Sequence, residues 1–134
     1  MRKDTLGLSE RLLESAETWL ALNVHHEARG ESYQCQVMVA EVTLRRVASS
    51  YYPDTVEGVV MQPSQFSWTL EREPDFSVIT QEDRNVARQA LKGLFYTTTE
   101  LHYARYEIDN YWTNKMTPTI QCGAHIFYDN GGKP

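Results

Sequence analysis

One short polar segment, His25-His26-Glu27-Ala28-Arg29-Gly30-Glu31, carries the side chains best suited to chemistry. Glu27 lies near the end of a predicted helix, where a carboxylate can project into a cleft. Burial against apolar or aromatic groups raises a carboxyl pKa and makes the group a general acid. The chain has eight Tyr, three Trp and four Phe, and such rings also stack on sugars. Glu27 is therefore the candidate catalytic acid, although a Glu at a helix end is more often a solvated residue.

Other chemistries fit this chain less well. Adjacent helical residues point about 100° apart, so His25, His26 and Glu27 do not converge on one ion. We therefore expect no metal and no cofactor. The spacing of Cys35 and Cys122 is not that of a metal site, and we predict two reduced thiols packed as small hydrophobes. A disulfide between them, and a Cys–His nucleophile, stay open as alternatives.

The elements that position these residues follow from hydrophobic periodicity. The predicted helices cover residues 9–26, 33–49, 55–61 and 80–95, with Ser9, Ser32, Thr55 and Thr80 as caps. Residues 63–68 form an extended loop or short strand, residues 101–103 and 124–128 form aromatic strands, and residues 104–121 are irregular. In the second helix, Glu41, Arg45 and Arg46 are expected to face away from the apolar stripe. The pattern predicts one α+β domain over residues 1–134, mainly helical with a small β element.

Charge and hydropathy restrict the partners. The chain of 134 residues has a net charge of −5, which argues against nucleic acid as a ligand. No run approaches the roughly 20 apolar residues of a membrane span, so we expect no membrane insertion. No apolar segment follows Met1-Arg2-Lys3, so no signal peptide is predicted and synthesis is expected in the cytoplasm.

Four blocks of sequence together resemble one known family. Glu27-Ala28-Arg29-Gly30-Glu31, followed by Gln36-Val37-x-Val39-Ala40-x-Val42-x-Leu44-x-Arg46-Val47, resembles the core motif of the spore cortex-lytic (SleB-type) cell wall hydrolases. Tyr52-Pro53-x-Thr55-Val56-x-x-Val59-Val60, Gln62-Pro63-x-Gln65-Phe66-Ser67-Trp68 and Gly123-x-His125-x-Phe127-Tyr128 resemble its later segments, in the family's order.

The resemblance implies a lysozyme-like, two-lobed domain with a glycan-binding cleft. It implies a lytic transglycosylase that cuts the bond between N-acetylmuramic acid and N-acetylglucosamine in bacterial peptidoglycan, with Glu27 as the catalytic residue. The residues that it places on the substrate side are Gln65, Phe66, Trp68, Tyr103 and His125. The chain looks like a bare catalytic unit of the kind found in phage endolysins. We accordingly expect a monomer that reaches peptidoglycan in the periplasm or cell wall with the help of a holin.

Two other functions stay open at this point. A hydrolytic muramidase needs a second carboxylate roughly 5 to 9.5 Å from the acid, and Glu31, Asp54 or Asp109 could supply it. Alternatively, the chain is an inactive glycan-binding module or a structural part of a virion.

Overall fold

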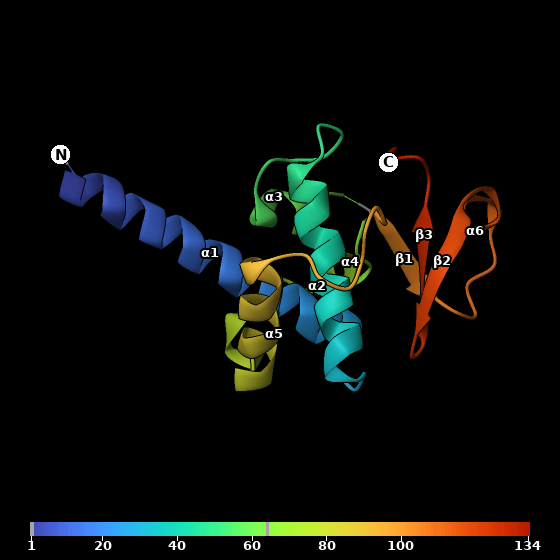
Figure 1. Cartoon of the computed structure of the whole chain (residues 1–134). Coiled ribbons are helices and arrows are strands. Elements are labelled where there is room, and N and C mark those ends of the chain that lie inside the picture. Colours follow the sequence, from blue (N-terminus) through green and yellow to red (C-terminus); the bar gives the residue numbers. More distant parts are fainter. Residues whose placement is uncertain (1, 64) are drawn as a thin grey trace.

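The computed structural model describes residues 2–63 and 65–134, and the side chains among them from residue 10 onward. Helices gather on one side of the molecule and a small sheet stands on the other (Figure 1). The helices are α1 (Arg2–Ala28), α2 (Tyr33–Ala48), α3 (Val56–Val60), α4 (Trp68–Glu71), the 3-10 helix η1 (Phe76–Val78), α5 (Gln81–Lys92) and α6 (Tyr111–Lys115). The strands are β1 (His102–Arg105), β2 (Thr117–Cys122) and β3 (His125–Asp129).

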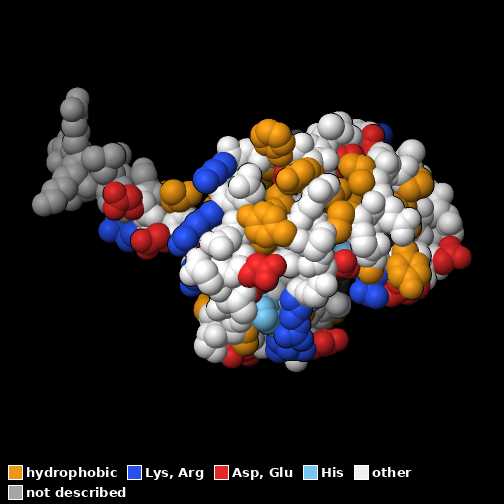
Figure 2. Space-filling model, turned by 60° about the horizontal axis from the view of Figure 1, so that its bottom comes forward, with side chains coloured by type: hydrophobic (Ala, Val, Ile, Leu, Met, Phe, Trp, Pro, Cys, Tyr) orange, Lys and Arg blue, Asp and Glu red, His pale blue; other side chains and the backbone are white. Residues whose placement is uncertain are grey.

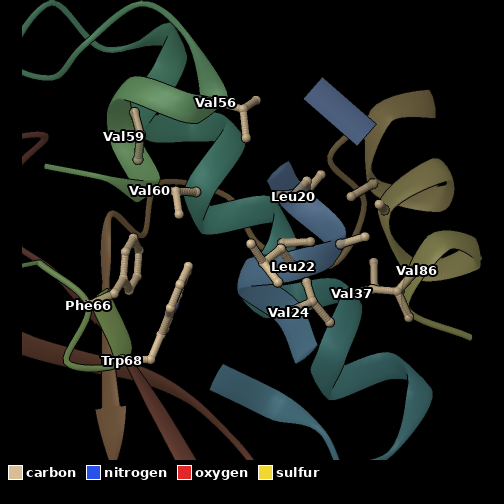
Figure 3. Close-up of a cluster of buried hydrophobic side chains, with 14 of the residues drawn as sticks. Leu20, Leu22, Val24, Val37, Val56, Val59, Val60, Phe66, Trp68 and Val86 are labelled. Atoms are coloured by element: carbon tan, nitrogen blue, oxygen red, sulfur yellow. The ribbon is translucent and has the colours of Figure 1, made fainter. Parts of the chain in front are cut away.

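The main core lies between α1, α2, α3 and α5. Figure 3 shows the apolar side chains of these helices pointing toward one another. Its labelled members are Leu20, Leu22, Val24, Val37, Val56, Val59, Val60, Phe66, Trp68 and Val86. The first part of α1 extends beyond this core (Figure 1), and Leu12 and Leu13, expected on its apolar face, are 61% and 59% exposed.

The sheet is antiparallel, with strand order β1-β3-β2 and Tyr103 paired with Phe127 across β1 and β3. It docks on the helices through a second, smaller core. That core consists of Ala28, Met38, Val39, Val42 and Phe127. Helix α2 therefore contributes to both cores.

Several boundaries differ from the sequence prediction. The caps at Thr55 and Thr80 are confirmed, and Thr80 and Asp83 form the expected capping box. Helix α1 begins well before Ser9, and α5 ends at Lys92 because Gly93 follows. The prediction that residues 104–121 are irregular was wrong, since this segment contains α6 and most of β2. The prediction of an extended loop or short strand at residues 63–68 was also wrong, because the described part is a series of turns that leads into α4.

The expected orientation of Glu41 and Arg46 was wrong. Glu41 is 0% exposed and accepts hydrogen bonds from the backbone N–H groups of Phe95, Tyr96 and Thr97. Arg46 is 5% exposed and donates from Nε to the Leu101 carbonyl at 2.8 Å. The chain that follows α5 covers this side of α2, and periodicity within one helix does not reveal such a cover.

The predicted reduced thiols were also wrong. Cys35, in the first turn of α2, and Cys122, at the end of β2, form a disulfide with their Cα atoms 5.5 Å apart. The bond joins the helical lobe to the sheet, and the two residues are 87 positions apart in sequence. Because the spacing was uninformative, only the folded arrangement reveals the pair.

Charged groups are distributed over the surface rather than segregated. Figure 2 shows acidic and basic side chains interspersed on one face, with hydrophobic side chains between them. Among the described helices, none has both the length and the apolar content needed to cross a bilayer.

Candidate active site

Glu27 occupies the last turn of α1, as the sequence predicted. The helix ends at Ala28, and the chain turns at Gly30, which has φ +90. This left-handed conformation favours glycine, because residues with a Cβ rarely adopt it. The N–H of Glu31 closes the turn on the Ala28 carbonyl at 3.0 Å, and Ser32 then caps α2. The sequence Ala-Arg-Gly-Glu-Ser thus ends one helix and begins the next, and it fixes where the Glu27 side chain emerges.

Glu27 lines a hollow of about 580 Å³ between the helical lobe and the sheet. The walls of this hollow include Gln65 from the loop before α4 and Tyr103 from β1. A second hollow of about 440 Å³ shares Gln65, Tyr103 and Trp112 with the first, so the two recesses adjoin. Together they form a groove, called the cleft below, with room for a chain-like ligand.

The surroundings of Glu27 favour its protonated form. The residue is partly buried, and this burial raises the pKa of its carboxyl above the usual value. A hydrogen bond from Tyr103 Oη to Glu27 Oε1, 2.9 Å long, and the positive charge of Arg46 lower the same pKa, but burial is the larger effect. A carboxyl group with a raised pKa keeps its proton to a higher pH than usual, which suits it to general acid catalysis.

Three of the five residues predicted on the substrate side line the cleft beside Glu27. Gln65 is exposed and accepts a hydrogen bond from Arg46 Nη1 at 3.2 Å. Tyr103 holds Glu27 directly, and burial raises the pKa of its hydroxyl well above the usual value. His125 packs edge-on against the Tyr103 ring, with centroids 5.5 Å apart, and is only 3% exposed. Their contact with substrate stays a prediction.

Phe66 and Trp68 are placed differently from the other three. Phe66 is 2% exposed and Trp68 is 4% exposed, and both belong to the main core (Figure 3). Trp68 Nε1 donates to Asn23 Oδ1 at 2.8 Å, and its ring stacks on His26. Neither residue lines either recess of the cleft. Their burial favours the core role that competes with sugar stacking.

The two histidines before Glu27 have separate partners. His25 Nδ1 lies 2.9 Å from Asp83 Oδ2 at the start of α5, and Arg29 approaches its Nε2 at 3.3 Å. His26 instead stacks on the Trp68 ring, with centroids 4.5 Å apart. Within the described side chains, no three His, Cys, Asp or Glu residues cluster closely enough to hold a metal ion.

The candidate second carboxylates do not line the cleft. Glu31 contacts the turn between β2 and β3, Asp54 lines a separate hollow beside α1 and α3, and Asp109 accepts from Asn114 Nδ2 at 3.0 Å. Of the described residues that line the cleft, Glu27 alone has a carboxylate side chain.

Sequence reasoning missed Trp112. This half-buried residue of α6 lines both recesses of the cleft and packs edge-on against Tyr128 at 5.6 Å. A usable signal was present, because Asn110 caps α6 by accepting from the N–H groups of Trp112 and Thr113. An Asn that precedes a short polar and aromatic run is a helix-start signal.

Comparison with known proteins agrees with this geometry. The family model described as cell wall hydrolase matches residues 30–128. The chain therefore belongs to the cell wall hydrolase family, as the resemblance predicted, although the match begins three positions after Glu27. The spore cortex-lytic enzyme of Oceanobacillus iheyensis is 34% identical over 113 residues, and that of Bacillus subtilis strain 168 is 36% identical over 109. Each match covers 81% of this chain but only 39% and 35% of the relative, so the chain spans well under half of their length.

Two solved structures share the fold. The catalytic domain of the germination-specific lytic transglycosylase SleB from Bacillus anthracis superposes with a TM-score of 0.77 at 29% identity. The alignment covers 85% of this chain and 93% of that domain. The catalytic domain of Bacillus cereus SleB gives a TM-score of 0.75 at 28% identity, with 87% and 91% covered. The predicted mainly helical, two-lobed fold with a small sheet is confirmed.

Proposed function

We propose that this domain is a lytic transglycosylase that cuts peptidoglycan between N-acetylmuramic acid and N-acetylglucosamine. The observation that carries the proposal is the single carboxylate side chain, Glu27, among the described residues that line the cleft. Conventional glycosidases need two carboxylates, roughly 5 to 9.5 Å apart, whereas an intramolecular transglycosylation needs one. The similar Bacillus anthracis domain is known as a germination-specific lytic transglycosylase, which supports the same choice.

The chemistry that we assign to Glu27 has two steps. Glu27 first gives its proton to the glycosidic oxygen, and the bond between that oxygen and C1 of the muramyl residue breaks. The C6 hydroxyl of the same muramyl residue then bonds to C1 and returns its proton to Glu27. The acid is thereby regenerated, and no water is consumed. Tyr103 keeps the carboxyl in place through its 2.9 Å hydrogen bond.

The product tests this mechanism directly. Digested peptidoglycan should release fragments with 1,6-anhydromuramyl ends, which are lighter by one water molecule than hydrolysed ends. Mass spectrometry of the muropeptides separates the two. Mainly reducing muramyl ends would indicate a muramidase and contradict the transglycosylase assignment. Reducing N-acetylglucosamine ends would mean that the other glycosidic bond is cut.

The biological setting that we propose is lysis of a bacterial host by a phage. The Cys35–Cys122 disulfide supports an enzyme that works outside the reducing cytoplasm, since such bonds persist in compartments like the periplasm. Expressed alone, the protein should leave cells turbid until the inner membrane is breached. Addition of chloroform or co-expression of a holin should then cause lysis. Lysis without either treatment would indicate another route of export.

A further inference from the structure

Glu31 lies four residues after Glu27, but its carboxylate contacts the sheet. Its Oε1 accepts the Ala124 N–H at 3.1 Å and lies 3.4 Å from His125 Nδ1. The Glu31 side chain is 16% exposed. Gly123, with φ +57, permits this approach, since a Cβ there would lie 2.1 Å from Glu31 Oε2. The carboxylate therefore occupies space that only a glycine at position 123 leaves free.

The turn between β2 and β3 is connected to Glu27 through two rings. His125 opens β3 and packs edge-on against Tyr103 at 5.5 Å. Tyr103, on the adjacent strand β1, donates its hydroxyl to Glu27. A displacement of the turn would therefore move the His125 ring and, with it, the donor that holds the catalytic carboxyl.

A second link holds the same end of the sheet. Cys122, the neighbour of Gly123, is bonded to Cys35 of α2, and Phe127 packs in the small core beneath. These links keep the sheet docked when a single polar contact is removed. Loss of the Glu31 contact should therefore change the alignment of the turn without unfolding the domain.

We infer that Glu31 is a positioning residue: it seats the turn at residues 123–125 and, through His125 and Tyr103, aligns the Glu27 carboxyl. This role deepens the proposed function and rests on it. It assigns the two carboxylates of the Glu-Ala-Arg-Gly-Glu segment to different tasks, chemistry for Glu27 and alignment for Glu31. It also explains why a carboxylate so near the acid in sequence is not its partner in hydrolysis.

Two substitutions at position 31 test the assignment. Glu31→Gln keeps an oxygen that can accept the Ala124 N–H, so turnover should stay within a few-fold of wild type. Glu31→Ala removes the acceptor, and the resulting misalignment should lower kcat by about 10- to 100-fold. Glu14→Ala, an exposed position on α1, serves as the matched control and should behave as wild type. Thiol titration and urea unfolding of each variant check that the disulfide and the fold are retained.

Tyr103→Phe supplies a readout that a merely structural role would not affect. If Glu31 acts through Tyr103, the Tyr103→Phe change should cost much less activity in the Glu31→Ala background than in wild type. The alkaline limb of the pH profile should also move in Glu31→Ala in the same direction as in Tyr103→Phe, and stay in place in Glu31→Gln. Additive losses, or full activity in Glu31→Ala, would overturn the inference.

The outcome for Glu31→Gln separates this inference from the proposed function. A loss as complete as that of Glu27→Gln would make Glu31 a chemical participant and overturn the positioning role. A change of the wild-type product to reducing ends would instead refute the transglycosylase mechanism. The ratio of Glu31→Gln to Glu31→Ala activity would still report alignment in that case.

Discussion

The cleft around Glu27 and the loop that follows α5, at residues 93–101, each hold a carboxylate away from water. The carboxyl pKa is raised in the cleft and lowered in the loop. In the loop, Glu100 is 1% exposed. Its burial would raise the carboxyl pKa, but hydrogen bonds from the N–H groups of Thr98 and Thr99 and from the Thr119 hydroxyl bring that pKa below its usual value. At Glu27 a single hydrogen bond, from Tyr103, does not offset burial, and the pKa rises.

Glu41 extends the comparison to the helix beneath that loop. It is fully buried, and its oxygens accept hydrogen bonds from three backbone N–H groups and from the Thr97 hydroxyl. Burial alone therefore does not distinguish Glu27, the proposed acid, from Glu41 and Glu100. The number of donors aimed at each carboxylate does, because donors stabilise the charged form.

The largest effect is expected at the acid itself. Glu27→Gln should lower peptidoglycan cleavage by at least about 10²- to 10⁴-fold, since the amide cannot donate a proton to the leaving oxygen. Because the folded-state pKa is raised, the ionisable carboxyl loses stability as the pH rises from the unfolded pKa through the folded pKa, so the variant should be at least as stable as wild type at neutral pH. Turbidity loss of permeabilised bacteria and urea unfolding measure the two quantities. Lysis within a few-fold of wild type would refute the role of Glu27.

For Glu41 we expect a loss of stability with little change in peptidoglycan cleavage. Glu41→Ala removes the acceptor of three backbone N–H groups, of which that of Thr97 is buried, and we expect a loss of about 3 kcal/mol in the free energy of unfolding. Cleavage well below the melting temperature should stay within a few-fold of wild type. Glu57→Ala, at an exposed position of α3, should change neither quantity. Unaltered unfolding of Glu41→Ala would contradict the structural role of that carboxylate.

A smaller and pH-dependent effect is expected for Glu100. Because its folded-state pKa is lowered, its charge contributes stability that is present above the unfolded pKa and is lost as the pH falls through the folded pKa. Glu100→Gln should therefore cost about 1 to 3 kcal/mol at neutral pH. The difference from wild type should narrow as the pH falls below the model-peptide value of 4.5. Urea titrations across that range measure it, and a constant difference would rule out linkage to this ionisation.

The helical half of the fold and the position of Glu27 at a helix end were predictable from sequence because their signals are local. Thr55 and Thr80 mark helix starts, Gly30 marks the helix end, and Glu27 precedes it in a recognisable segment. Side chains on α2 show what hydrophobic periodicity cannot predict. Periodicity assigns a charged residue to the solvent side, but Glu41 is covered by a loop more than fifty residues away in sequence.

The walls of the cleft depended on contacts that single-sequence patterns do not contain. The Asn110 cap marks the start of the helix that carries Trp112 but not its place beside the cleft, and the Cys35–Cys122 bond joins segments 87 residues apart. Phe66 and Trp68 have the residue types of a sugar-binding site, yet both lie in the core. Composition identifies such rings as candidates, and only packing decides which face they present.

The subtlest readout, a displacement of a pH profile, is expected where the number of donors at Glu27 itself changes. Tyr103→Phe removes the hydroxyl that lies 2.9 Å from Glu27 Oε1 but keeps the ring that packs on His125. The hydrogen bond lowers the pKa of Glu27 against the effect of burial, so its loss should raise that pKa further. Activity requires the protonated acid, so the alkaline limb of kcat/KM against pH should move to higher pH. The charge of Arg46 still acts in the opposite sense, which limits the movement. Tyr51→Phe, at a position 57% exposed and one residue from Tyr52 of the cleft wall, should leave the profile in place. A limb that moved to lower pH, or not at all, would mean that the ionisation of Glu27 does not set it.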